Sequence, residues 1–433
     1  MIFLYHLFLD VYSGGIRLAS LWNKKARSWV SGRTNYFDNL KSSYSAKPGK
    51  RIWMHCASLG EFEQGRPVLT KIKDFYPEAT VIITFFSPSG YDIVKDNPEF
   101  DHVYYLPIDS PGNARKLVDI LNPDLVLWIK YEYWHYYLRE LKNRKIPVLL
   151  ISGVFLKNQP FFKWYGKFWR KMLEGFSHFF VQNEASKQQL LQLVPGEKIT
   201  VAGDTRCDRV INISRNFVDV PGIPEFCGSS TVVVAGSTWE DDEAEWIHFV
   251  KQHPDIKFIV APHEVNAENI AEVNKGFAGS ITYSELMRNA SSKPPVSIPT
   301  ATSNTSHCLI IDSIGMLSRL YKYAMITYVG GGFGYNGLHN ILEAAVYGKP
   351  VIFGPEYEKN FEAVELIASS GAISIESALE LEDVVNKLLT QPEEIVSRGA
   401  AAAKYVYNNA GASDKIMSYI NGNIFGGSNR GKV

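Results

Sequence analysis

The chain has 433 residues, 45% of them hydrophobic and 21% charged, which is enough for two globular domains with a core each. Lysine plus arginine and aspartate plus glutamate both number 45, so no overall charge attracts the chain to nucleic acid. The four cysteines are scattered without CxxC spacing, which argues against a disulfide framework or a zinc site and favours a reducing, cytosolic setting. We therefore expect neither a metal ion nor a nucleic-acid partner.

The amino-terminal residues 1–22 are apolar, but His6, Asp10 and Arg17 interrupt them. They lack the run of about 20 apolar residues that a spanning helix needs, and the cleavage site of a signal peptide. Basic residues follow directly, and this combination is typical of an anchor that lies in the interface of an anionic membrane. We expect residues 1–35 to form a membrane-interfacial helix that lies in a cytoplasmic leaflet. A helix packed on the protein's own core is the alternative.

From residue 51 onward, short β-rich runs alternate with helical stretches. The runs are apolar throughout, as expected for parallel strands covered by helices on both faces. They are residues 51–57, 80–86, 102–107, 124–130, 148–152, 178–182 and 198–203 in the first half, and residues 230–236, 257–262, 280–282, 307–311, 324–331 and 350–354 in the second.

A stretch rich in proline, glycine and serine, residues 216–230, separates the two series of runs. The pattern predicts an α/β fold of two doubly wound, Rossmann-like domains, residues 36–215 and 216–420, which face a central cleft where ligands bind. We expect residues 284–306 to form a mobile loop and residues 421–433 a flexible tail.

The stretch CASLGE, residues 56–61, follows the first predicted strand. Ser58 and Glu61 fit the S-x-x-E capping box, in which both side chains satisfy free amides at a helix start. Gly65 and Pro67 disfavour a continuous helix, because glycine costs roughly 1 kcal/mol and proline about 3 kcal/mol in a helix interior. We expect at most one turn at Ser58, a main helix that begins at Pro67, and Glu61 in the loop between them. The local sequence leaves open whether Glu61 is a helix cap or a catalytic base.

The strongest motif of the second half begins with three glycines, residues 330–332, which close a predicted strand. Glycines there allow backbone amides to approach an anion, and the helix that follows adds its dipole, so a phosphate group fits. Asn340 and Glu343 lie on one face of the first turn of that helix. Glu343 could accept hydrogen bonds from a ribose, while Asn340 could bind a phosphate or a carboxylate. The alternative is a capping box made by the same two residues.

Three further turns follow strands of the same predicted sheet. Ser237 lies in a Gly-Ser-Thr turn that could hold phosphate oxygens, and His263 follows Pro262 at the next strand end. Residues 314–316 offer backbone groups that could bind a nucleobase. Each turn alone is typical of an ordinary strand-to-helix connection. Together with the glycine motif, they predict a nucleotide site at the carboxyl edge of this sheet.

Two charged residues follow strands of the first domain. Glu132 comes just after one strand and Arg206 just after another. Arg206 could neutralise a departing phosphate, and the alternative is a salt bridge to Asp204 or Asp208. We expect Glu61, Glu132 and Arg206 to face the nucleotide across the cleft. The chain has no Ser-His-Asp order, HExxH motif or Walker lysine that would indicate another chemistry.

Six motifs in chain order, HCASLGE, YEYW, GDTRCD, GSTWEDDE, GLHNILEAAVYGKPVIFGP and KNF, resemble those of the 3-deoxy-D-manno-octulosonic acid (Kdo) transferases of lipid A biosynthesis. The resemblance runs from the amino-terminal anchor to residue 420 or so. It implies an inverting GT-B glycosyltransferase of lipopolysaccharide biosynthesis that uses CMP-Kdo as donor and a lipid A precursor of the lipid IVA type as acceptor, without a cofactor. It implies Glu61 as the proton acceptor, and Glu132 and Arg206 as transition-state stabilisers. The implied CMP contacts are Pro262, His263, Ile314, Gly315, Met316, Asn340, Ile341, Leu342 and Glu343.

The chain departs from the pattern of this family at three places. His263 stands where the family commonly has arginine, Lys130 where it commonly has a second glutamate, and His135 and Tyr136 where it commonly has asparagine. The remaining alternatives are another GT-B sugar-nucleotide enzyme, such as a UDP-sugar transferase or epimerase, and a non-catalytic membrane-bound protein that binds lipid or nucleotide.

Residues 161–173 interleave aromatic and basic side chains. At 100° per residue, a helix would gather apolar residues on one face and basic residues on another. Tryptophan with lysine and arginine settles at a lipid headgroup boundary, so we expect this segment to bind an anionic membrane surface. The alternative is an ordinary amphipathic helix with solvated lysines. The apolar face would be Phe161, Tyr165, Phe168 and Met172, and the basic face Lys163, Lys167, Arg170 and Lys171.

Overall fold

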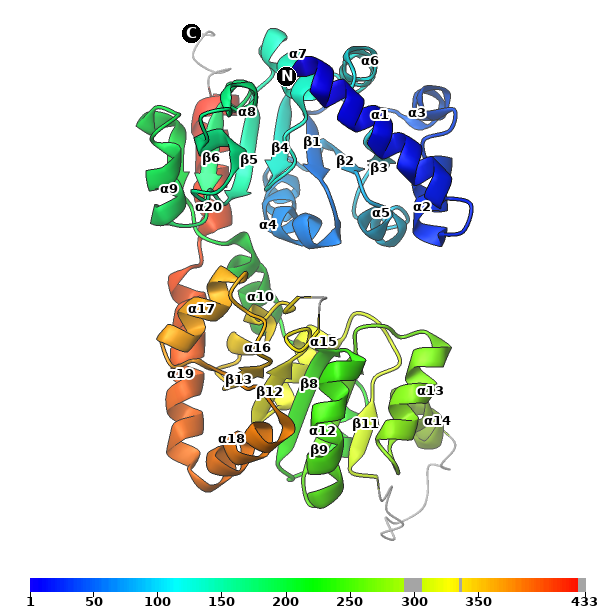
Figure 1. The fold of residues 1–433 in the computed structure, drawn as a ribbon, viewed down its shortest axis with the longest axis vertical. Helices are drawn as coiled ribbons and strands as arrows, with labels where there is room; N and C mark the ends of the chain where they lie inside the picture. The colour runs from blue at the N-terminus through cyan, green and yellow to red at the C-terminus, as the bar shows by residue number, and fades with distance from the viewer. Residues whose placement is uncertain (292–305, 335–336, 427–433) are drawn as a thin grey trace. The chain divides into compact units, whose positions relative to one another are not determined.

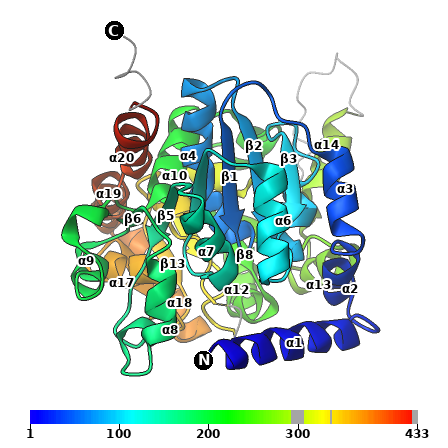
Figure 2. The same ribbon diagram turned by 90° about the horizontal axis from the view of Figure 1, so that it is seen from above.

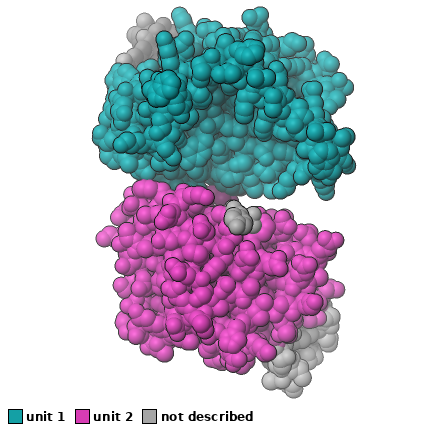
Figure 3. Space-filling model, in the orientation of Figure 1, with its two compact units in different colours: residues 1–208, 410–433 teal, residues 209–409 magenta. Residues whose placement is uncertain are grey.

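The structure, a computed structural model, describes residues 1–291, 306–334 and 337–426. It divides into two compact units, which Figure 3 shows in teal and magenta. Unit 1 consists of residues 1–208 with the chain from residue 410 onward, and unit 2 consists of residues 209–409.

The chain enters unit 2 within helix α10 (Thr205–Arg215), and helix α20 (Ala412–Tyr419) belongs to unit 1. The apolar side of α20 packs into the core of unit 1, which places these borders before the expected ones at residues 215 and 420. The start of the expected tail is a π-helix, η4 (Ile420–Phe425). The end of that tail lies outside the described residues, as does most of the loop expected before residue 306.

Unit 1 is built on a parallel sheet of seven strands in the order β3-β2-β1-β4-β5-β6-β7, with helices on both faces (Figure 1). The chain winds outward from β1 in both directions, which is the doubly wound arrangement that the sequence predicts. All seven predicted runs are strands. The strands are β1 (Arg51–Cys56), β2 (Thr80–Phe85), β3 (His102–Tyr105), β4 (Leu125–Ile129), β5 (Val148–Gly153), β6 (His178–Val181) and β7 (Ile199–Val201). The helices are α1 (Ile2–Ala19), α2 (Lys24–Ser31), α3 (Tyr36–Ser43), α4 (Leu59–Phe75), α5 (Pro88–Val94), α6 (Pro111–Leu121), α7 (His135–Asn143), α8 (Lys167–Leu173) and α9 (Glu184–Leu190).

Unit 2 contains a second parallel sheet of seven strands, in the order β10-β11-β9-β8-β12-β13-β14. Strand β14 (Ala372–Ser374) is the strand of this sheet that the sequence patterns do not predict. The other strands are β8 (Val232–Thr238), β9 (Lys257–Pro262), β10 (Ile281–Thr282), β11 (Cys308–Ile310), β12 (Ile326–Val329) and β13 (Val351–Phe353). The helices after α10 are α11 (Ile223–Cys227), α12 (Glu240–Gln252), α13 (Ala267–Gly276), α14 (Tyr283–Ser291), α15 (Leu317–Leu320), α16 (Leu342–Ala345), α17 (Phe361–Ala368), α18 (Ala378–Thr390) and α19 (Pro392–Asn408).

Helix α4 runs without a break from Leu59 to Phe75, so the expectation of a separate helix beginning at Pro67 is wrong. Burial outweighs the local cost of glycine and proline, because one side of α4 packs on β1 and β4. Gly65 allows close packing there, since a Cβ atom would lie 2.4 Å from the Sδ atom of Met54, which would have to move. Glu61 therefore stands in the first turn of a long helix and not in a loop.

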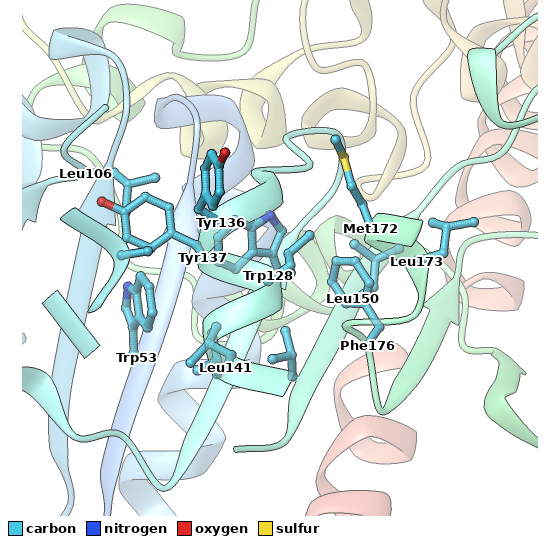
Figure 4. Close-up of a cluster of buried hydrophobic side chains, with 14 of the residues drawn as sticks. Trp53, Leu106, Trp128, Tyr136, Tyr137, Leu141, Leu150, Met172, Leu173 and Phe176 are labelled. Atoms are coloured by element: carbon cyan, nitrogen blue, oxygen red, sulfur yellow. The ribbon is translucent and has the colours of Figure 1, made fainter. Parts of the chain in front are cut away.

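Large side chains fill the core of unit 1 between the sheet and helices α7 and α8 (Figure 4). Trp53 on β1 and Trp128 on β4 are completely buried, with ring centroids 5.9 Å apart. Tyr137 on α7 packs edge-on against Trp53. These rings support β1 and β4 beneath the charged residues that follow the two strands.

Helix α1 lies along the margin of unit 1 (Figure 2). Tyr5 donates a 2.6 Å hydrogen bond to the buried carboxylate of Asp109, which also accepts the first amides of α7. The ring of Tyr12 stacks on Phe86, just after β2. His135 and Tyr136, two of the departures from the family pattern, pack their rings against Tyr5. One side of α1 is thus docked on the loops that follow β2, β3 and β4.

The other side of α1 is apolar and exposed. In the described part of the chain, no helix is both long and apolar enough to cross a membrane. A membrane-interfacial role for α1 stays a prediction. The exposed apolar residues of this segment are Ile2, Phe3, Leu4, Leu7, Phe8, Val11, Leu18, Leu21 and Trp22.

The expectation that residues 161–173 form one amphipathic helix is wrong. A 3₁₀ turn at Pro160–Phe162 and a short loop come before α8. Three of the four expected apolar positions are buried, but Tyr165 is exposed, and its neighbour Trp164 is 92% exposed. Arg170 is part of the loop structure, because its guanidinium donates hydrogen bonds to two backbone carbonyls of the segment.

Candidate functional site

Glu61 is only 8% exposed, and its Oε2 atom accepts a 2.5 Å hydrogen bond from the backbone amide of Ala57. Burial raises the pKa of Glu61 to about 7, and the charge of Glu132 adds to the rise. The amides of Ala57 and Tyr131 and the charge of Lys130 act in the opposite direction. A carboxyl group with a pKa near neutrality is suited to accept a proton at physiological pH.

The capping box predicted for Ser58 and Glu61 does not form. Ser58 is the N-cap residue of α4, but its side chain makes no capping hydrogen bond. Glu61 binds the amide of Ala57, one residue before the N-cap, rather than that of Ser58. The carboxylate of Glu61 therefore stabilises the turn before the helix. This contact is compatible with a role of Glu61 as a base.

Glu132, just after β4, is held by aromatic N–H groups. Its Oε2 atom accepts hydrogen bonds from Nε2 of His55 at 3.0 Å and from Nε1 of Trp134 at 3.1 Å. Its backbone carbonyl accepts a hydrogen bond from Nε1 of Trp128. Lys130, which precedes it, has a φ angle of 55°, a left-handed conformation that is uncommon for a residue with a long side chain.

Arg206, at the start of α10, is paired with Asp204. The guanidinium donates to both carboxylate oxygens over distances of 2.6 to 3.2 Å. Burial raises the pKa of Asp204, but Arg206 more than offsets this, so that the pKa lies below its usual value. The salt bridge weighed as an alternative role is therefore present. Asp208 instead caps α20 by accepting the amides of Gly411 and Ser413.

Lys130 connects the two groups of charges in unit 1. Its positive charge lowers the pKa of Glu61 and also that of Asp204. The structure thus brings the predicted residues Glu61 and Glu132 together, with the Asp204–Arg206 pair within electrostatic reach of Lys130. Among the residues that the structure describes, no group of three His, Cys, Asp or Glu side chains is arranged to hold a metal ion.

In unit 2, a buried carboxylate holds the glycine motif. Asp242 on α12 accepts hydrogen bonds from the amide of Gly331 at 2.8 Å, the amide of Trp239 at 2.9 Å and the hydroxyl of Tyr328 at 2.7 Å. The backbone of Gly330 packs closely on β8, since a Cβ atom would lie 2.4 Å from a carbonyl oxygen there. The amide of Gly331, one of those expected to approach a phosphate, is thus occupied by the protein's own carboxylate.

Three rings lie together at the carboxyl edge of the second sheet. Strand β8 bulges at Ser237, whose φ angle is 55°, and the carbonyl of Thr238 then accepts the amide of His263 at 2.9 Å. The ring of His263 stacks on Trp239 and on His339, with centroid distances of 4.6 and 4.4 Å. Nε1 of Trp239 donates to Nε2 of His339 at 2.9 Å. Burial, and next the charge of His263, lower the pKa of His339 to about 4, which keeps that ring neutral.

The side chains of Asn340 and Glu343 contact one another. Nδ2 of Asn340 donates to Oε1 of Glu343 at 3.2 Å, while its Oδ1 accepts the amide of Leu342 at 3.3 Å. Nη1 of Arg209 lies 3.9 Å from the same Oε1 atom. The bond to Leu342 is the turn-forming contact of the capping alternative, and the bond to Glu343 orients that carboxylate.

At another strand end of unit 2, the predicted nucleobase contacts form an open turn. Ile314 is 81% exposed, and Gly315 has a φ angle of 91° that favours glycine. Met316 is the N-cap residue of helix α15, and its carbonyl accepts the amides of Arg319 and Leu320. An exposed apolar side chain beside open backbone groups is suited to a flat ring.

Sequence reasoning missed His55, Trp239 and His339 as members of these sites. Each lies inside a motif quoted for the family resemblance, which was the available signal. Their partners are distant in the sequence, so their roles become visible only in the fold.

Residues 31–209 match the family model described as 3-deoxy-D-manno-octulosonic-acid transferase (kdotransferase). A curated 3-deoxy-D-manno-octulosonic acid transferase from Rickettsia felis is 26% identical over 395 residues, which cover 88% of this chain and 80% of the relative. Another, from Haemophilus influenzae, is 23% identical over 418 residues, which cover 94% of this chain and 93% of the relative. The likeness to these relatives therefore extends through both units.

Solved structures with a similar fold include enzymes that act on sugar nucleotides. UDP-GlcNAc 2-epimerase from Neisseria meningitidis, bound to UDP-GlcNAc, has a TM-score of 0.60 at 19% identity and covers 86% of this chain and 100% of its own. A glycosyltransferase from Rickettsia africae has a TM-score of 0.55 at 17% identity and covers 88% of this chain and 99% of its own. At such identities the likeness concerns the fold alone, and it confirms the predicted GT-B class.

Proposed function

Because this chain belongs to the Kdo transferase family, we propose that it transfers Kdo from CMP-Kdo to a hydroxyl group of a lipid A precursor, of the lipid IVA type, in lipopolysaccharide biosynthesis. The reaction inverts the configuration at the anomeric carbon. The observation that carries the proposal is the buried Glu61, whose pKa burial raises to about 7. A base with such a pKa is ready to accept the proton of a sugar hydroxyl.

In the proposed reaction, Glu61 accepts the proton of the acceptor hydroxyl while the oxygen attacks the anomeric carbon of Kdo. The bond from that carbon to the phosphate of CMP breaks, and its electron pair leaves with CMP. General-base help of this kind is worth typically 10²- to 10⁴-fold in rate. Glu132, fixed by His55 and Trp134, stabilises the positive charge that develops on the sugar ring.

We assign the binding of the donor nucleotide to unit 2, and the neutralisation of the departing CMP phosphate to Arg206. Glu343 accepts hydrogen bonds from the ribose, and the turn at residues 314–316 receives the cytosine. His263 and the neighbouring Asn340 address the phosphate or the carboxylate of Kdo. Arg206, held in place by its salt bridge to Asp204, neutralises the departing phosphate, so the scheme does not require a metal ion.

We also assign the apolar side of α1 to the surface of the inner membrane, on its cytoplasmic face. The contacts of α1 support this, because they lie on the edge of unit 1 that carries the catalytic carboxylates. Tyr12 stacks on Phe86, Phe86 packs on Trp134, and the indole of Trp134 binds Glu132. A phosphorylated lipid that meets α1 would therefore have its sugar headgroup near these carboxylates.

The proposal is tested with purified protein, CMP-Kdo and a lipid A precursor in detergent or liposomes. We expect release of CMP and a lipid product heavier by one or more Kdo residues in mass spectrometry. A UDP-sugar in place of CMP-Kdo tests the epimerase and UDP-sugar transferase alternatives, and it should yield no product. Failure to transfer Kdo, or turnover of the UDP-sugar instead, would contradict the proposal.

A further inference from the structure

His55 on β1 is a completely buried residue whose two ring nitrogens both have polar partners. Nδ1 lies 3.0 Å from Oγ1 of Thr84 on β2, and Nε2 lies 3.0 Å from Oε2 of Glu132 after β4. The ring also packs against Trp128, with centroids 4.5 Å apart. His55 thus bridges both neighbours of β1 directly behind Glu132.

Glu132 sets the direction of the hydrogen bonds in this chain of groups. Its carboxylate only accepts, so the ring proton of His55 that faces it lies on Nε2. Nε1–H of Trp53 donates to one lone pair of Oγ1 of Thr84 at 2.8 Å, and the hydroxyl hydrogen of Thr84 remains to donate to Nδ1 of His55. The opposite tautomer would set a lone pair of Nε2 against the carboxylate.

Glu132 links this chain of hydrogen bonds to Glu61, the proposed proton acceptor. Its charge acts on Glu61, as does the opposing charge of Lys130. Oε2 of Glu132 accepts hydrogen bonds from His55 and from Trp134, and His55 is the donor on the buried side. Without His55, this carboxylate loses its donor on the buried side.

We propose that His55 is a positioning residue for the transfer reaction: its Nε2–H fixes the orientation of the Glu132 carboxylate beside Glu61, and Thr84, bonded to Trp53, binds the other ring nitrogen and keeps Nε2 directed at Glu132. This inference rests on the proposed function. A carboxylate that is oriented before the reaction does not have to reorganise as charge develops on the sugar, and this lowers the barrier to transfer.

The test compares His55→Asn with His55→Gln. The asparagine amide can take the place of Nδ1 beside Thr84 but does not reach Glu132, whereas the glutamine amide reaches the place of Nε2. We expect His55→Asn to lower kcat by about 10- to 100-fold, as for the loss of one hydrogen bond to a charged group, with an unchanged KM for CMP-Kdo. His55→Gln should recover most of the lost kcat. Thr84→Val removes the hydroxyl partner of Nδ1 but keeps the imidazole, and it should lower kcat by less than His55→Asn.

The matched control for damage to the core is His178→Asn. His178 is a buried histidine of β6 whose Nε2 is bonded to Oγ1 of Thr200 at 2.8 Å, with no carboxylate partner. The His178→Asn variant should be less stable than the wild type but have the same kcat.

The inference is overturned if His55→Asn has the same kcat as His178→Asn, or if the kcat of His55→Gln falls as far as that of His55→Asn. If His55→Asn does not fold, Thr84→Val decides, and wild-type kcat in that variant overturns the inference. Wild-type protein that transfers no Kdo contradicts the proposed function itself, so the two failures are distinguishable.

Discussion

The carboxyl edges of the two sheets carry different chemistry, although each is a parallel sheet of seven strands with its first strand in the interior. At the edge of unit 1, Glu61 is buried and its pKa rises to about 7, so that it keeps an affinity for protons near neutral pH. At the edge of unit 2, the buried Asp242 has its oxygens occupied by three hydrogen bonds that hold a glycine turn. The first carboxylate is suited to reaction and the second to structure.

This difference fits the proposal that one fold serves two tasks. In unit 1, charged residues extend from strand ends and act on one another, and together with burial they set the pKa of Glu61. In unit 2, backbone turns and the stacked rings of Trp239, His263 and His339 form a rigid border suited to a bound nucleotide. The proposed division assigns proton transfer to unit 1 and donor binding to unit 2, and each of the following changes tests one side of it.

Glu61→Gln should have the largest effect, because it removes the proton acceptor. Turnover should fall by about 10²- to 10⁴-fold, while calorimetry shows unchanged CMP affinity. The folded-state pKa of Glu61 is raised, so ionised Glu61 destabilises the fold as the pH rises above its usual pKa. At about pH 8 the glutamine variant should therefore be at least as stable as the wild type. If Glu61→Gln keeps its activity and loses about 1 kcal/mol in unfolding free energy, Glu61 is a helix cap and not the base.

Replacing Lys163, Lys167 and Lys171 together with glutamine should weaken sedimentation with anionic liposomes. Each lysine near such a surface contributes about 1 kcal/mol, which salt reduces progressively. Arg170 is retained because it holds the loop. The KM for the lipid acceptor should rise while CMP affinity stays constant. Unchanged sedimentation would mean that the lysines of residues 161–173 are solvated and do not bind the membrane. The matched control changes three exposed lysines of unit 2 in the same way, Lys251, Lys275 and Lys404.

Glu343→Ala should weaken CMP binding by about 10-fold in calorimetry, as expected for one lost hydrogen bond to a charged group. Turnover at saturating donor should change less than in Glu61→Gln, because Glu343 is assigned to unit 2 and to binding. Thermal unfolding must be compared in parallel, since Glu343 also bonds to Asn340. Unchanged CMP affinity in a folded variant would show that the ribose is held elsewhere.

Ser58→Ala should have the smallest effect. Its side chain makes no capping hydrogen bond, so the free energy of unfolding in urea should change by less than about 0.5 kcal/mol. Ser110 is the matched comparison in unit 1, because its hydroxyl accepts the amide of Asn113 at the start of α6. Ser110→Ala should lose about 1 kcal/mol. Equal losses in the two variants would mean that Ser58 caps α4 after all.

The strands could be predicted from the sequence because burial on both faces leaves apolar runs without alternation. Helix α4 could not, since the local penalties of Gly65 and Pro67 are visible in the sequence, whereas the packing of Gly65 on Met54 is not. Motif spacing placed Asn340 and Glu343 on one side of a helix start, and the structure brings their side chains into contact just before and within α16.

The hydrogen-bond networks of the two sites were beyond prediction for a different reason. They join residues that are 29, 77 and 100 positions apart, as from His55 to Thr84 and to Glu132, or from Trp239 to His339. Only the order of strands in each sheet brings such residues together. The same holds for the raised pKa of Glu61, because burial by the fold is its largest cause.

The most direct test of the central claim is the single-turnover rate of Kdo transfer, measured with enzyme in excess between about pH 5 and pH 9 for the wild type and Glu61→Gln. If Glu61 is the base, the wild-type rate falls as the pH drops through about 7, where the carboxylate takes up its proton. The glutamine variant should show a rate lower by orders of magnitude and without this fall. A wild-type rate that is constant across the range, or a glutamine variant that follows the wild-type profile, would contradict the account.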